Sequence, residues 1–74
     1  MIICTFNKTR DAIQAEKICK RESVEYRIIP VPRSISANCG MAIEVEKGKK
    51  DVLMSGLESK GISAQTYDKA DVKQ

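Results

Sequence analysis

One cysteine of this chain stands among residues that could support chemistry. Cys39 lies between Asn38 and Gly40 in the polar run PVPRSISANCG, residues 30–40, directly before the apolar run MAIEV. The thiolate is the nucleophilic form of cysteine, and a free thiol with a pKa of about 8.5 needs nearby stabilisation to ionise at neutral pH. The residue types leave two interpretations open: a reactive exposed thiol, or a small apolar side chain packed in the core.

The neighbours of Cys39 could supply that stabilisation. Arg33 could add positive charge, and Ser34, Asn38 and their neighbours in the loop offer hydrogen-bond donors to a sulfur anion or adduct. Gly40 leaves the sulfur open to a docking partner and permits unusual backbone angles. Each residue also has an ordinary role as a solvated cation or turn former, so composition alone does not decide between the two interpretations.

The other two cysteines, Cys4 and Cys19, stand in apolar segments and are expected to be small core residues. Three cysteines cannot all pair within one chain, and in a reducing compartment we expect free thiols. Their spacing contains no CxxC motif, which argues against a soft-metal chaperone and predicts no metal site. The chain has no histidine, the commonest general base. The sequence therefore favours a carrier or accessory protein over a self-contained enzyme.

Length and composition limit the function further. A chain of 74 residues forms one domain with a modest core, and one Phe, two Tyr and no Trp make that core aliphatic. The net charge of +3 is spread along the chain except at Lys47, Lys49 and Lys50, which we interpret as a solvated turn and not as a nucleic-acid site. No apolar stretch reaches about 18 residues, and no secretory leader is evident. We expect a cytoplasmic protein without membrane partners.

Hydrophobic periodicity and turn residues predict six elements in the order βαββαβ. They are a strand over residues 1–6, a helix over 9–21, a strand over 24–30, a strand over 41–46, a helix over 49–60 and a strand over 62–67. Residues 68–74 are predicted to be a frayed polar tail, which leaves residues 1–67 as a single domain.

Several residues mark where these elements begin and end. Asn7 or Thr9 could cap the first helix, and Gly61 suits a left-handed cap after the second. Pro30 and Pro32 suit a strand at the edge of a sheet. The run MAIEVE alternates between apolar residues and glutamates, which predicts a half-buried strand with Glu44 on the polar face.

The predicted order of elements indicates an α+β fold of the ferredoxin-like type, with a four-stranded antiparallel sheet and two helices on one face. In that topology the first and second strands lie parallel on either side of the third. Residues 7–11 and residues 31–40 should therefore emerge at the same end. This placement would bring the amino end of the first helix, with Lys8 and Arg10, close to Cys39 and favour its thiolate.

The chain also resembles a known family. The apolar strand, the helix containing DAIQAEK and the run RIIPVPRSISANCGMAI are similar to the selenium/sulfur carrier protein-like family of small bacterial domains, over residues 1–67. The specific part is Pro32 and Arg33 followed by Cys39 and Gly40. The resemblance implies that Cys39 holds sulfur or selenium as a persulfide or selenosulfide, with Arg33 as electrostatic partner of the bound anion.

Two functions remain open. In the first, Cys39 accepts the cargo from a donor such as a cysteine desulfurase and passes it to an acceptor protein, supported by Arg33, Gly40, Asn38 and Arg10. The cargo itself is then the only bound group, so no cofactor is expected. In the second, the domain is a noncatalytic interaction or regulatory module that docks through the edge strand at residues 24–30, and Cys39 is incidental. A homodimer is compatible with either function.

Overall fold

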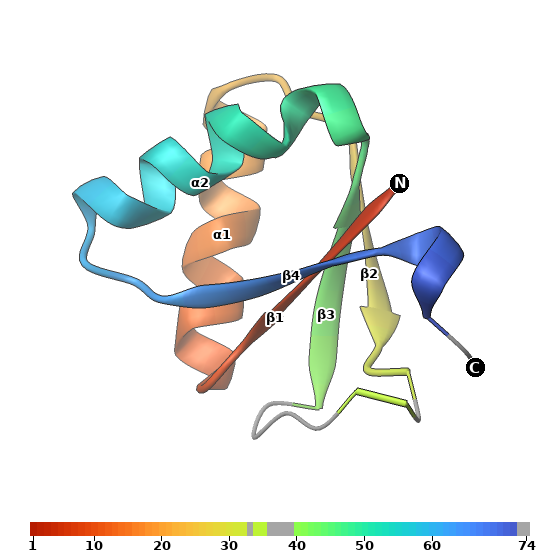
Figure 1. Cartoon of the computed structure of the whole chain (residues 1–74). Helices are drawn as coiled ribbons and strands as arrows, with labels where there is room; N and C mark the ends of the chain where they lie inside the picture. The colour runs from red at the N-terminus through yellow and green to blue at the C-terminus, as the bar shows by residue number, and fades with distance from the viewer. Residues whose placement is uncertain (33, 36–39, 73–74) are drawn as a thin grey trace.

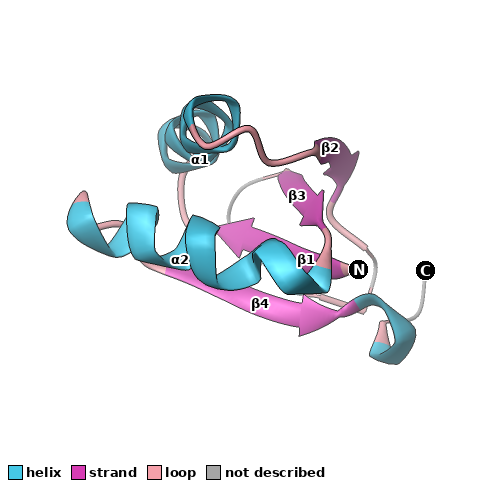
Figure 2. Cartoon of the chain, turned by 90° about the horizontal axis from the view of Figure 1, so that it is seen from above, coloured by secondary structure: helices cyan, strands magenta, loops and turns pink. Residues whose placement is uncertain are grey.

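The computed structural model describes residues 1–32, 34–35 and 40–72. The elements are β1 (Ile2–Phe6), α1 (Thr9–Arg21), β2 (Tyr26–Pro30), β3 (Met41–Val45), α2 (Lys50–Ser59) and β4 (Ala64–Asp68), with short 3₁₀ turns at Lys47–Lys49 and Lys69–Asp71. The strands form one sheet in the order β2-β3-β1-β4, and every neighbouring pair is antiparallel. Both helices cover one face (Figures 1 and 2). The predicted ferredoxin-like α+β fold is confirmed.

The register of the sheet fixes which ends of the strands meet. Ala42 of β3 lies opposite Thr5 of β1 on one side and opposite Ile29 of β2 on the other. Because β1 and β2 are both antiparallel to β3, they run in the same direction and finish at one end of the molecule. The start of α1 and the segment that follows β2 therefore emerge at this common end, as Figure 1 shows. The prediction is confirmed for the described residues.

The main core fills the space between the sheet and the helices. The buried side chains are mainly aliphatic, as predicted, and include Phe6, Ile18, Ile43, Leu53 and Leu57. The two helices approach closely at Gly56, where an added Cβ would lie 2.7 Å from Cγ2 of Ile18. Val52, near the start of α2, lies outside this core, and 38% of it is exposed.

A second, smaller apolar cluster covers the opposite face of the sheet. Ile3, Ile35 and Ala42 are buried in it, and Ile29, Val31, Tyr67 and Val72 pack around them. We call this set the second-face cluster. Its members come from the sheet, from the segment after β2 and from the end of the chain, so this face is partly covered although α1 and α2 lie on the other face.

The same face corrects the prediction for Glu44. Only 3% of this residue is exposed, and its Oε2 lies 2.9 Å from Nζ of Lys69. Residues 68–72 are not a frayed tail: the backbone N–H of Lys69 donates to the carbonyl of Met1, and the Asp68 side chain accepts from the N–H of Ala70. The end of the chain is held against the sheet and supplies the cation that pairs with the glutamate.

The helix ends agree only partly with the sequence. α1 has its N-cap at Lys8, which is extended and makes no side-chain capping bond, so the prediction of Asn7 or Thr9 is wrong. Gly61 has φ +70°, and the N–H groups of Gly61 and Ile62 donate to the carbonyls of Glu58 and Leu57. The predicted left-handed cap is confirmed. No helix in the described part of the chain has the length and apolar character to cross a membrane.

Candidate functional site

The segment after β2, residues 31–40, is called the thiol loop here because it contains Cys39. Its two ends are tied together, since the N–H of Val31 donates to the carbonyl of Gly40 at 3.4 Å. A second bond, from the N–H of Ile35 to the carbonyl of Pro32 at 3.0 Å, closes a turn near its start. The loop therefore leaves and rejoins the sheet at adjacent points of β2 and β3.

Ile35 fastens the thiol loop to the body of the protein. Its exposed fraction is 8%, and it belongs to the second-face cluster with Ile3 and Ala42. Burying such a side chain contributes roughly 1.5 to 3 kcal/mol relative to leaving it in water. Sequence reasoning missed this anchor, although an isolated isoleucine in a run of polar residues is a signal that could have revealed it.

The structure places only part of the predicted site. Cys39, Arg33 and Asn38 lie outside the described residues, so their proposed roles stay predictions. Gly40 is described and exposed. An added Cβ at Gly40 would meet no atom within 4 Å. The carbonyl of Gly40 continues the antiparallel pairing next to β3, and the expectation that Gly40 permits unusual backbone angles stays a prediction.

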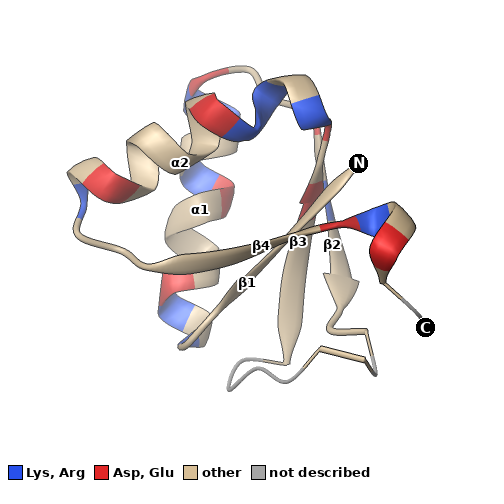
Figure 3. Ribbon diagram, viewed as in Figure 1, with Lys and Arg blue, Asp and Glu red and all other residues tan. Residues whose placement is uncertain are grey.

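Arg10 lies at the same end of the molecule as the thiol loop. It is exposed in the first turn of α1 and lines a shallow hollow of about 560 Å³ with Lys8, Lys60 and Ile62. This hollow contains no described residue of the thiol loop. Figure 3 shows positive charge at the start of α1 and, at the opposite end of the sheet, around the start of α2, the part of the chain that contains Lys47, Lys49 and Lys50. Arg10 thus adds positive charge at the end of the molecule where the thiol loop emerges, on the side where β4 begins.

Cys4 and Cys19 are core residues, as predicted. Both side chains are fully buried. Burial raises the pKa of the Cys4 thiol to about 11, with a smaller contribution from Cys19 nearby. Burial and then the negative charge of Glu16 raise the pKa of Cys19. Both thiols therefore remain protonated at neutral pH, so neither of the described cysteines is a good nucleophile.

The described residues contain no group of three side chains that could hold a metal ion. Among the described residues, this end of the molecule therefore offers three features: the two tied ends of the thiol loop, the exposed Gly40 and the cationic start of α1.

Comparison with known proteins adds one finding. No curated protein and no solved structure matches the chain. Residues 1–67 match one protein family, and the match includes both helices, all of the thiol loop and most of β4. The chain therefore belongs to the family described as "Putative Se/S carrier protein-like".

Proposed function

We propose that this protein carries sulfur or selenium as a persulfide or selenosulfide on Cys39, between a donor such as a cysteine desulfurase and an acceptor protein. The observation that carries the proposal is the state of the other cysteines. Cys4 and Cys19 are fully buried with raised thiol pKa values, so neither suits a transfer reaction. Membership of a family described as carriers supports the same assignment.

The transfer needs no oxidant. The Cys39 thiolate attacks the terminal sulfur of a donor persulfide, a new S–S bond forms at Cys39, and the donor's S–S bond breaks. The electron pair of the broken bond leaves on the donor cysteine as a thiolate, and the proton stays on the transferred sulfur. A donor selenosulfide reacts in the same way through its terminal selenium. The acceptor thiolate then repeats the step and releases Cys39 unchanged.

The described part of the thiol loop suits this role. The loop is fixed at Val31, Ile35 and Gly40, so the segment before Gly40 begins and ends at defined points of the fold. Gly40 is exposed and open on its Cβ side, which leaves room for a partner beside Gly40 itself. The amino end of α1 lies at the same end and favours an anion there by about 0.3 to 1 kcal/mol.

The test is anaerobic loading followed by intact-mass measurement. Incubation with a persulfide donor should add the mass of one sulfur atom to the wild-type protein. The adduct should be absent in Cys39→Ser and retained in Cys19→Ala, a matched variant at a buried cysteine. A wild-type protein that gains no sulfur or selenium overturns the proposal and favours the noncatalytic interaction module.

Iodoacetamide kinetics give an independent check on the thiol. A Cys39 that reacts faster than a free cysteine with a pKa of about 8.5 at neutral pH supports a stabilised thiolate. A rate equal to that of a free cysteine would argue that the loop gives the sulfur no special environment. The buried Cys4 and Cys19 serve as internal references in the same experiment.

A further inference from the structure

Strand β2 forms one edge of the sheet and presents unpaired backbone groups. In Figure 2 no element of the described chain lies beyond it on that side. Ile28, in the middle of the strand, is 48% exposed, an unusual exposure for a large apolar side chain in a sheet. Exposed edge strands of this kind are templates for pairing with another strand.

The backbone groups that point outward can be identified. The N–H of Val31 donates to Gly40, so Val31 faces β3. Because residues alternate along an antiparallel ladder, Ile29 and Arg27 also face β3, whereas Tyr26 and Ile28 direct their N–H and C=O groups to the open edge. Pro30 is the next outward residue, and it has no N–H to donate.

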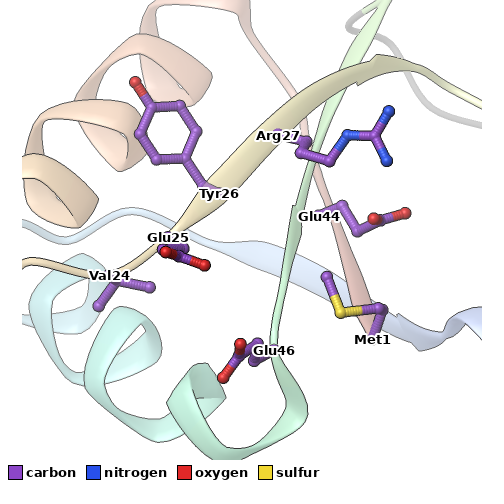
Figure 4. Close-up of a pocket in the computed structure, with 7 residues that line it drawn as sticks. All are labelled: Met1, Val24, Glu25, Tyr26, Arg27, Glu44 and Glu46. Atoms are coloured by element: carbon purple, nitrogen blue, oxygen red, sulfur yellow. The ribbon is translucent and has the colours of Figure 1, made fainter.

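Two side chains of opposite charge lie two residues apart along this edge. Glu25 precedes the strand and Arg27 lies within it, and both are exposed. Arg27 projects beside Glu44 on one face, whereas Tyr26 points toward α1 on the other (Figure 4). A hollow of about 390 Å³ lies at this part of the edge, lined by Val24, Glu25, Tyr26 and Arg27 among others.

We propose that two copies of this chain pair antiparallel along β2, with the twofold axis at Tyr26, so that their sheets become continuous. In this register Tyr26 faces the partner's Tyr26 and they exchange backbone hydrogen bonds. Ile28 donates its N–H to the carbonyl of the partner's Val24, whose own N–H is already bound to Cys19. Glu25 then lies opposite the partner's Arg27, and this favourable pair occurs twice.

Other registers of the two β2 strands would make a less stable pair. An axis at Arg27 places Arg27 against the partner's Arg27, and like charges directly opposite each other destabilise a sheet. An axis at Ile28 sets Tyr26 opposite the partner's Pro30, which lacks an N–H, and leaves Glu25 without its partner. Shifting the register by one residue would place side chains that face the helices in one copy opposite side chains that face away from the helices in the other. Charge and hydrogen bonding therefore select the axis at Tyr26.

The proposed dimer leaves the thiol loops open. Pro30 lies four residues from the axis, a distance of about 13 Å along an extended strand. Because the two strands run in opposite directions, the thiol loops leave at opposite ends of the joined sheet. Dimerisation and the chemistry of Cys39 are therefore separate properties, and either one can be tested without the other.

The test is sedimentation of the full chain over a range of concentrations, with charge-reversal variants. Glu25→Arg replaces both opposite-charge pairs with like-charge pairs and should raise the dimer dissociation constant about tenfold. Glu58→Arg makes the same change in net charge at an exposed site on α2 and should leave the dissociation constant unchanged. The double variant Glu25→Arg, Arg27→Glu restores the pairs in reversed order and should recover dimerisation.

Thermal unfolding of each variant separates a lost interface from a lost fold. A wild-type chain that stays monomeric at every concentration overturns the proposal, and the edge would then be open to a different protein. A dimer that Glu25→Arg and Glu58→Arg weaken equally, or that the double variant fails to restore although it is folded, would place the interface elsewhere.

Discussion

At the scale of single residues, the three cysteines differ in their sequence context, and the two that the structure describes are both buried. Cys4 lies in a strand buried on both faces, and Cys19 lies on the inner side of α1. Apolar neighbours in the sequence predicted both positions correctly. The setting of Cys39 in the sequence is polar and glycine-bounded, and its proposed role rests on that contrast.

The raised pKa of Cys4 predicts a specific loss of stability at alkaline pH. The folded-state pKa is about 11 and the ordinary value is 9.0, so below pH 9 the thiol is protonated in both states and has no effect. As the pH rises from 9 to 11 the unfolded chain releases this proton first, and the free energy of unfolding falls by about 1.4 kcal/mol per pH unit. Urea unfolding at several pH values should show this loss in wild type. Cys4→Ala should show a shallower decline, and identical slopes would contradict the buried-thiol assignment.

The glycines give a second prediction. Gly40→Ala should leave the free energy of unfolding within about 0.5 kcal/mol of wild type, because an added Cβ there has open space. Gly61→Ala should cost about 1 kcal/mol, because Gly61 holds φ +70°. Urea denaturation measures both changes. If Gly40→Ala also slows sulfur loading while stability is unchanged, Gly40 serves the approach of a partner; a large stability loss would show that the loop needs it.

At the scale of elements, periodicity predicted the helices and strands well because each has an apolar stripe or an alternating pattern. α1 begins and ends at the predicted residues, 9 and 21. The sequence did not reveal the second-face cluster, because its members come from separate segments and none forms a periodic pattern with the others. Glu44 was misassigned for the same reason, since its partner Lys69 is distant in the chain.

The pair of Glu44 and Lys69 gives a prediction for the end of the chain. Lys69→Ala leaves Glu44, only 3% exposed, without its cation and should lower the free energy of unfolding by about 1 kcal/mol. Adding Glu44→Gln should recover part of the loss, because the amide carries no charge. Lys47→Ala is the matched control, since Lys47 and Asp68 form an exposed pair at 3.9 Å that should contribute little. Equal losses in Lys69→Ala and Lys47→Ala would mean that burial gives the first pair no special importance.

At the scale of the whole molecule, the topology of the sheet brings the segments around the candidate site to one end. Three antiparallel pairings bring the end of β1, the start of α1 and the ends of the thiol loop to one end of the sheet. This juxtaposition followed from the order of elements alone and is confirmed. The segment at the centre of the loop is short and largely polar, and it has no hydrophobic periodicity. For this reason sequence patterns predict the chemistry of its side chains but not their geometry.

The two proposals concern different surfaces of the molecule. The thiol loop lies at the end of the sheet, and the edge of β2 runs along its side. A carrier that meets a donor and an acceptor in turn benefits from an exposed site that its own assembly does not cover. Variants at Glu25 should therefore change the oligomeric state without changing the rate of sulfur loading.

The most direct measurement is to map the loaded sulfur onto the three cysteines. Wild-type protein exposed anaerobically to a persulfide donor is alkylated, digested and analysed by mass spectrometry, and the peptides containing Cys4, Cys19 and Cys39 are compared. We expect a persulfide or selenosulfide on Cys39 alone, whose terminal sulfur or selenium an acceptor thiol then removes. Sulfur on Cys4 or Cys19 in the folded protein, or none on Cys39, would contradict it.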